Sequence, residues 1–176
     1  MGKKAEGSWG GMRKYLEQEM LADVLRGRVR YRCTTYVGMD GCRIIEIFID
    51  NHCFKQFSWE TVNSYFIRMG YTQISPPLSI PEYWAGYQAL LKQHPMNERT
   101  EYEDNEFCDA LRQYRSSDIR ESVHSPNPIV RMFALLDRRV GKRTLNALKA
   151  EMAHAPEWLQ EVYAIRTSAG VKPGEL

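Results

Sequence analysis

The spacing of hydrophobic residues changes from helical to alternating within the first quarter of the chain. From Ser8, which can cap a helix, apolar residues recur three or four positions apart and predict a helix that ends at Gly27. The segments 28–37 and 42–50 alternate between apolar and polar residues, and 53–57 predicts a third short strand. Turn residues separate these segments, so the pattern predicts a three-stranded antiparallel meander.

Side-chain chemistry indicates the register of the first two strands. When paired residue numbers sum to 78, apolar residues face apolar residues on one side of the sheet, and charges face opposite charges on the other. The expected pairs are Val29 with Ile49, Tyr31 with Ile47, Cys33 with Ile45, Arg32 with Glu46 and Arg28 with Asp50. A shift by one residue would set apolar residues against charges on both faces, so this register is favoured.

Beyond residue 57 the hydrophobic pattern is helical almost throughout. The expected helices are 58–70, 81–94, 105–123, 128–140, 142–153 and 156 to about 170, with Ser58, Pro81 and Asn127 marking three of the starts. The fold class that follows is α+β: an N-terminal helix, a three-stranded antiparallel meander and helices, then a C-terminal half built of helix pairs. The polar stretch 95–104 divides an α/β-meander lobe, 1–97, from a helical lobe, 98–176, and we expect the two to fold as one unit.

The composition is that of an ordinary globular protein. The 176 residues suit one domain or two joined lobes, and the apolar and charged fractions are 43% and 26%. A net charge of +2 is small for a dedicated nucleic-acid binder. No apolar run approaches the roughly 18 residues of a membrane span, and the first residues lack the apolar core of a signal peptide. We therefore expect no membrane association and a cytoplasmic location.

No local motif of catalysis or metal binding stands out in the sequence. The segment around Gly141 does not match a phosphate-binding loop, because Leu136 occupies the first glycine position and Arg143 follows Lys142. The four cysteines are scattered and the histidines form no short-spaced pair, so we expect reduced thiols, no metal site, no cofactor and no recognisable catalytic residue. The acidic run 98–109 could serve acid–base chemistry or bind a metal, but a solvated link and a helix start are favoured.

Two groups of basic residues could contact a partner. Arg28, Arg30 and Arg32 lie on one face of the first strand, where they could contact a nucleic-acid backbone. The expected register gives two of them acidic partners, so a solvated sheet face is favoured. The second group lies at and beyond the corner between the expected helices 128–140 and 142–153. It forms the candidate partner-binding surface, which consists of Arg138, Lys142, Arg143 and Lys149.

Asp137 is a charged residue expected inside this same corner. At 100° per residue it falls between Val130 and Phe133, within the apolar face of its helix. A carboxylate in that position is partly buried and must find a hydrogen-bond partner. The nearest donors in sequence are the backbone N–H groups that begin the next helix and the side chains of Lys142 and Arg143. We therefore expect Asp137 to pin the corner.

Several stretches of the chain resemble a known family. They are "SW…KYLE" near the start, "GRVRY" at the first strand, "NPIVRMFALLDRRVGKRTL" at 127–145 and "PEWLQEVYAIR" at 156–166. In these stretches the chain is similar to a family of small uncharacterised bacterial proteins with no assigned function. The resemblance implies a bacterial, cytoplasmic origin and one co-folded unit, and it brings no activity and no site.

Three functions remain open on the sequence alone. The first is a non-enzymatic cytoplasmic protein-interaction module that uses the helical half as a scaffold. The second is nucleic-acid binding through the basic faces, which salt-dependent retention on DNA or RNA would reveal. The third is an enzyme whose site is assembled from distant residues, which an apolar cleft with converging polar side chains would support.

Overall fold

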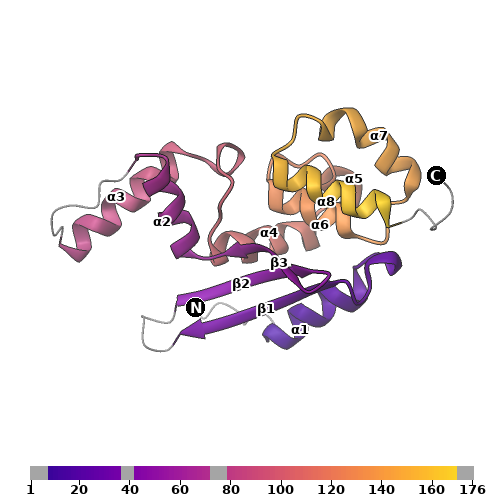
Figure 1. Cartoon of the computed structure of the whole chain (residues 1–176), viewed down its shortest axis with the longest axis horizontal. Coiled ribbons are helices and arrows are strands. Elements are labelled where there is room, and N and C mark those ends of the chain that lie inside the picture. The colour runs from indigo at the N-terminus through magenta and orange to yellow at the C-terminus, as the bar shows by residue number, and fades with distance from the viewer. Residues whose placement is uncertain (1–7, 37–41, 72–78, 170–176) are drawn as a thin grey trace.

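The fold is α+β, and the computed structural model of the chain describes residues 8–36, 42–71 and 79–169 (Figure 1). The antiparallel sheet has the order β1–β2–β3, formed by β1 (Val29–Tyr36), β2 (Cys42–Ile49) and β3 (His52–Phe57). The helices are α1 (Trp9–Lys14), α2 (Trp59–Arg68), α3 (Ile80–Gln93), α4 (Asp104–Ser116), α5 (Ile119–Ser122), α6 (Pro128–Leu136), α7 (Lys142–Met152) and α8 (Glu157–Ser168). Shorter helical turns are η1 (Tyr15–Glu19), η2 (Asp23–Leu25) and η3 (Met96–Glu98).

The predicted register of the first hairpin is confirmed. The inward-facing pairs are Val29 with Ile49, Tyr31 with Ile47 and Cys33 with Ile45. On the outer face, Nε of Arg32 lies 2.6 Å from Oε2 of Glu46, and Nη2 of Arg28 lies 2.8 Å from Oδ2 of Asp50. The expected turn at 38–41 lies outside the described residues. Register is therefore fixed by the same apolar and ionic pairs that the sequence pattern contains.

A tight turn joins β2 to β3. Asp50 and Asn51 both have positive φ angles, 51° and 68°, as the two central residues of a type I′ hairpin turn do. Asp and Asn tolerate this left-handed region better than other residues with a side chain. A bulge between Ile47 and Phe48 then shifts the pairing of β2 with β3. The third strand is present where the sequence predicts it.

The N-terminal helix is shorter than predicted, because a tertiary contact replaces its last turns. Regular α-helix ends at Lys14, a π-type turn follows to Glu19, and Leu21 forms an isolated antiparallel bridge with Asp137. Two backbone hydrogen bonds make this bridge, from the Ala22 N–H to the Leu136 carbonyl at the end of α6 at 2.9 Å and from the Arg138 N–H to the Met20 carbonyl at 2.8 Å. The expectation of one helix to residue 27 is therefore wrong.

Two later helices also end earlier than the hydrophobic pattern predicts. The expected helix 105–123 is split into α4 and α5, because the backbone is extended at Ser117. The hydroxyls of Ser116 and Ser117 donate hydrogen bonds to the Gln113 carbonyl at 3.0 and 2.8 Å, which compete with continued helix. Asp118 then caps α5 by accepting a hydrogen bond from the Arg120 N–H at 2.7 Å. The expected helix 128–140 ends at Leu136, so Asp137 has an extended backbone.

The main hydrophobic core lies between the sheet and the helices α4, α6, α7 and α8. It contains residues from both sides of the 97/98 boundary that the sequence suggests, so the meander and the helical half share one core. Phe107 of α4 is central: its ring centroid lies 4.9 Å from that of Phe57 and 5.2 Å from that of Phe133. Burial of these apolar side chains supplies most of the stabilisation of such a unit.

A second, smaller core joins α2 to α3, and we call this helix pair the arm. Its buried members are Val62, Tyr65, Phe66 and Tyr87. The arm stands away from the sheet in Figure 1. Contacts between Trp59 and Tyr83 near the starts of the helices, and between Phe66 and Tyr87 farther along, show that α2 and α3 run in a similar direction.

Candidate interaction surfaces

Asp137 is buried at the corner between α6 and α7, with an exposed fraction of 1%. Its Oδ2 accepts a hydrogen bond from the Tyr114 hydroxyl, and its Oδ1 accepts one from the Arg139 N–H at 2.6 Å. The Arg139 guanidinium adds an ion pair, with Nη2 2.8 Å from Oδ2. Burial, together with the bond to Asp137, raises the pKa of Tyr114 and keeps its hydroxyl a donor. The carboxylate is thus satisfied by α4 and by its own turn.

The partners expected for Asp137 are wrong, because α6 ends one residue before it. The extended backbone at Asp137 and a turn closed by the Val140 N–H, 3.2 Å from the Asp137 carbonyl, carry Arg139 back over the carboxylate. Lys142 and Arg143 lie instead in the first turn of α7 and are exposed. Sequence reasoning missed Tyr114 and Arg139 because it continued α6 as a helix through the corner.

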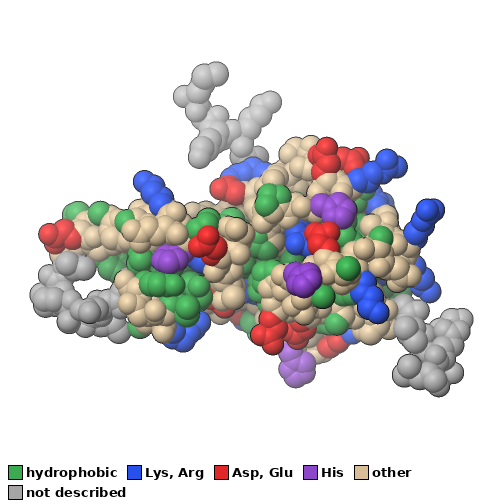
Figure 2. All heavy atoms as spheres, turned by 90° about the horizontal axis from the view of Figure 1, so that it is seen from above, with side chains coloured by type: hydrophobic (Ala, Val, Ile, Leu, Met, Phe, Trp, Pro, Cys, Tyr) green, Lys and Arg blue, Asp and Glu red, His purple; other side chains and the backbone are tan. Residues whose placement is uncertain are grey.

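The side chains of the predicted partner-binding surface are brought together at the surface of this corner and along α7, and we call them the basic face. Arg138, Lys142, Arg143 and Lys149 are all exposed. Their side chains make no ion pair with any described residue. The opposite side of α7 is buried, as the sequence predicts, through Leu145, Leu148 and Met152. Lys and Arg side chains are seen along the rim at this end of the molecule in Figure 2.

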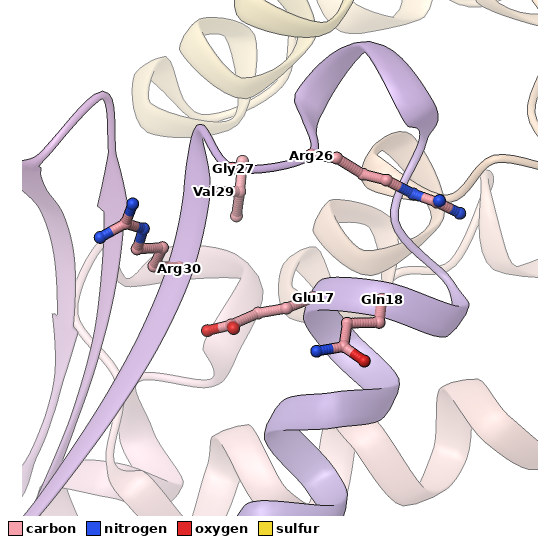
Figure 3. A pocket seen from close by; sticks show the side chains of 6 residues that line it. All are labelled: Glu17, Gln18, Arg26, Gly27, Val29 and Arg30. Carbon is pink, nitrogen blue, oxygen red and sulfur yellow. The ribbon is translucent and has the colours of Figure 1, made fainter.

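Arg30 of β1 and Arg26, which precedes the strand, line an open hollow of about 440 Å³ (Figure 3). Glu17 reaches from η1 toward β1, whereas the side chains of Arg26 and Arg30 point to opposite sides. Oε1 of Glu17 accepts a hydrogen bond from the Tyr31 N–H at 2.7 Å, so this carboxylate is used to cover the edge of β1. With its cations diverging and its carboxylate occupied, the hollow does not present a converging set of polar groups to a small ligand.

The acidic run connects the arm to the main core. Its helix start is confirmed, because Glu103 and Glu106 form a capping box at the beginning of α4. The expectation that the run is solvated is wrong for Glu103, which is buried and accepts a hydrogen bond from the Tyr87 hydroxyl at 2.7 Å. Arg99 is also buried and pairs with Glu106. These polar contacts attach α3 to α4.

Exposed hydrophobic side chains gather on the arm, and we call Met69, Tyr71, Ile80 and Trp84 the arm surface. Among the described residues they are four of the five large hydrophobic side chains that are exposed. Hydrophobic side chains are seen together over the arm in Figure 2. The hydrophobic spacing of 58–70 sets Met69 on the same side of its helix as Val62 and Phe66, which are buried, but Met69 itself is exposed. The remaining members were not singled out, because an exposed aromatic residue in a helical pattern looks the same as a buried one.

The described residues show no reactive thiol, no metal-binding cluster and no membrane-spanning helix. Cys33, Cys53 and Cys108 are free; Cys108 is buried as expected of a core thiol, whereas Cys53 is exposed. Burial is the main cause that raises the pKa of each thiol, which favours the unreactive protonated form. Residues 8–36, 42–71 and 79–169 contain no cluster of three His, Cys, Asp or Glu side chains suited to a metal. None of the helices in these ranges has the length and apolar character of a membrane span.

Comparison with known proteins identifies a family and no characterised relative. No curated protein and no solved structure matches the chain. The model of the SF0329 protein family matches residues 8–167, which include the sheet, the arm and the other helices except the last residue of α8. The chain therefore belongs to the SF0329 protein family.

Proposed function

We propose that the protein is a non-enzymatic protein-interaction module that binds a partner protein through the arm surface. The observation that carries the proposal is the exposure of Ile80 and Trp84, 75% and 44%, at positions i and i+4 of α3. Side chains four residues apart on a helix form a continuous row. Exposed apolar rows of this kind are typical of interfaces, in which Trp, Tyr and Met are enriched.

The partner element that fits the arm surface best is an amphipathic helix. Tyr71 stacks on His94 with ring centroids 4.0 Å apart, and His94 follows Trp84 by ten residues, or about 15 Å along a helix axis. The two ends of the arm surface are thus separated by about three turns of a partner helix, which could bury apolar residues against both.

Charge along the arm adds an orientation to this proposal. The acidic residue Glu60 follows Trp59, whose ring contacts Trp84, whereas the basic residue Arg68 precedes Met69 at the other end of the arm surface. A partner helix with basic residues over the first end and acidic residues over the second would be complementary to it. That arrangement also suits the dipole of the partner helix when its acidic end is the N-terminus.

The test compares the full chain with two variants as baits in its native cell. Ile80→Ser combined with Trp84→Ser removes the apolar row, and Gln88→Ser is a matched control on an exposed part of the same helix. The proteins of interest are those that co-purify with the control variant but not with the double variant. Each of these is purified and titrated with the unmodified chain, the double variant and the control. We expect the double variant to bind at least about 30-fold more weakly, since truncating a central aromatic residue costs about 2 kcal/mol. Equal affinities of the three baits for every such protein would contradict the proposal.

Nucleic-acid binding through the basic face is the second candidate function. The supporting observation is that four exposed cations lack acidic partners within the described ranges, unlike Arg28 and Arg32 on the sheet. The triple variant Lys142→Ala, Arg143→Ala, Lys149→Ala tests it in filter-binding titrations at several salt concentrations. Loss of each phosphate contact should reduce the slope of log affinity against log salt by about one. A slope near zero for the unmodified protein would exclude this function.

The proposal includes a cytoplasmic location. The free thiols of Cys33, Cys53 and Cys108 support it, because reduced cysteines persist in reducing compartments. Cell fractionation with detection of the native protein tests the location directly.

A further inference from the structure

We propose that α3 also pairs, in antiparallel orientation, with α3 of a second copy of the chain. Four exposed residues of this helix, Glu82, Ala85, Ala89 and Lys92, recur at intervals of three, four and three. This is the spacing of the a and d positions of a coiled coil. Tyr87, 2% exposed, lies on the opposite side of α3, where it is held by the second core and by Glu103. The row therefore faces away from the molecule.

Charge complementarity selects the second copy as the occupant of this row. In an antiparallel pair, an a residue of one helix packs against a d residue of the other. Glu82 then faces Lys92 of the second copy, and Ala85 faces Ala89, with each contact made twice by the twofold symmetry. A parallel pair would instead set Glu82 against Glu82 and Lys92 against Lys92, which repel each other.

Glu82 and Lys92 can both form the ion pairs that this arrangement requires. The Glu82 carboxylate accepts hydrogen bonds from the Ser79 N–H at 2.9 Å and from the Ser79 hydroxyl at 2.7 Å, which orient it at the start of α3. The same bonds lower the pKa of Glu82 and keep it charged. Lys92 has no ion-pair partner in the described parts of the chain, so a second copy supplies the first one.

The size of the row indicates a weak, reversible dimer. The 14 residues of α3 extend for only about 21 Å. Two alanine layers allow the helices to approach closely, at the short end of the interaxial range of about 8–10 Å. They bury little apolar area, so the interface falls below the roughly 1,200 Å² of a stable complex. The row is separate from Ile80 and Trp84, and a partner and a second copy therefore use different sides of α3.

Sedimentation velocity of the full chain from about 10 μM to about 1 mM, the range of weak association, tests the pairing through charge exchange. Glu82→Lys alone and Lys92→Glu alone should each abolish dimerisation, because like charges then meet twice. A mixture of the two variants should dimerise again, because every charged contact in the mixed pair joins opposite charges. Loss of dimerisation in each variant alone, with recovery in the mixture, would identify the antiparallel arrangement.

Glu82→Lys also removes the capping box of α3 and could weaken the helix. A further variant therefore tests the pairing without changing the capping box. Ala89→Arg changes an exposed residue, so the monomer should keep its circular dichroism spectrum and melting temperature while the dimer is lost. Ile80→Ser with Trp84→Ser should leave the dimer intact, which separates this proposal from that of a partner on the arm surface. The pairing is wrong if the unmodified chain stays monomeric up to about 1 mM, or if Ala89→Arg and Lys92→Glu dimerise as it does.

Discussion

The hydroxyl of Tyr114 donates a hydrogen bond to the carboxylate of Asp137, and both side chains are almost completely buried. Tyr114 belongs to α4 and Asp137 to the corner that follows α6, so this bond joins two residues that are 23 positions apart in the sequence. The backbone of Asp137 also pairs with Leu21 near the N-terminus. One residue thereby holds three distant segments of the chain together.

Removing the Asp137 carboxylate should destabilise the protein. Asp137→Ala leaves the buried Tyr114 hydroxyl and the Arg139 N–H without their acceptor, and an unmade hydrogen bond at a dry site costs about 1–3 kcal/mol. Urea unfolding monitored by circular dichroism measures this loss. Tyr114→Phe should cost less, and the cost of the double change should be smaller than the sum of the two single costs because the residues share one bond.

The matched control for the corner is the triple alanine variant of Lys142, Arg143 and Lys149. These side chains are exposed, and exposed charges contribute little to stability. We expect the free energy of unfolding to change by less than about 0.5 kcal/mol. If Asp137→Ala left stability unchanged while the triple variant unfolded, the basic side chains would be the buried group at this corner and Asp137 would be the exposed one.

The contact between Glu17 and β1 should protect one particular amide. Oε1 of Glu17 accepts a hydrogen bond from the N–H of Tyr31 on the edge strand. Glu17→Ala should therefore speed hydrogen exchange at Tyr31 and cost about 1 kcal/mol, whereas Glu17→Gln keeps an acceptor and should change both much less. Amide exchange followed by NMR distinguishes the two. Unchanged protection of Tyr31 in Glu17→Ala would show that the side chain does not cover this edge.

The ion pair between Arg32 and Glu46 should make a small contribution to the hairpin. Glu46→Arg sets two arginines opposite each other and should destabilise by about 0.5–1 kcal/mol. Adding Arg32→Glu restores an opposite-charge pair in the reverse order and should recover part of this loss. Thermal melts at low and at high salt provide the measurement. High salt should reduce the difference between the single variant and the unmodified protein.

Glu103 should make stability depend on pH in the acid range. Burial is the main cause that raises the pKa of this carboxyl above its ordinary value of 4.5, so the folded state binds its proton more tightly than the unfolded state. The stability contributed by the protonated form is complete below 4.5 and is lost as pH rises through the raised pKa.

Glu103→Gln isolates this contribution, since it keeps an acceptor for the Tyr87 hydroxyl without a titrating charge. Urea unfolding of both proteins between about pH 4 and pH 7 should show the variant gaining stability relative to the unmodified protein as pH rises. Parallel curves for the two proteins would mean that Glu103 has the same pKa in the folded and unfolded states.

The local features of this protein follow from its sequence. The alternating segments and the charges of Arg28, Arg32, Glu46 and Asp50 determine three strands and their register, because a slip of one residue would turn every apolar side chain to the wrong face. Helix starts are equally local, since capping depends on residues within one turn. Ser58 and Asn127 cap α2 and α6 as predicted, whereas α3 begins one residue before Pro81, at Ile80, and is capped by Ser79.

The ends of helices and the choice of partners were decided only by the tertiary structure. The hydrophobic spacing cannot reveal that helical structure stops before Leu21 and again before Asp137, where the two segments form backbone hydrogen bonds with each other. Each segment is the partner that the other needs. The same limit explains why Tyr114 and Arg139, rather than Lys142 and Arg143, satisfy Asp137. Whether Trp84 is buried or exposed likewise depends on which helix packs beside α3, and burial is a property of the assembled fold.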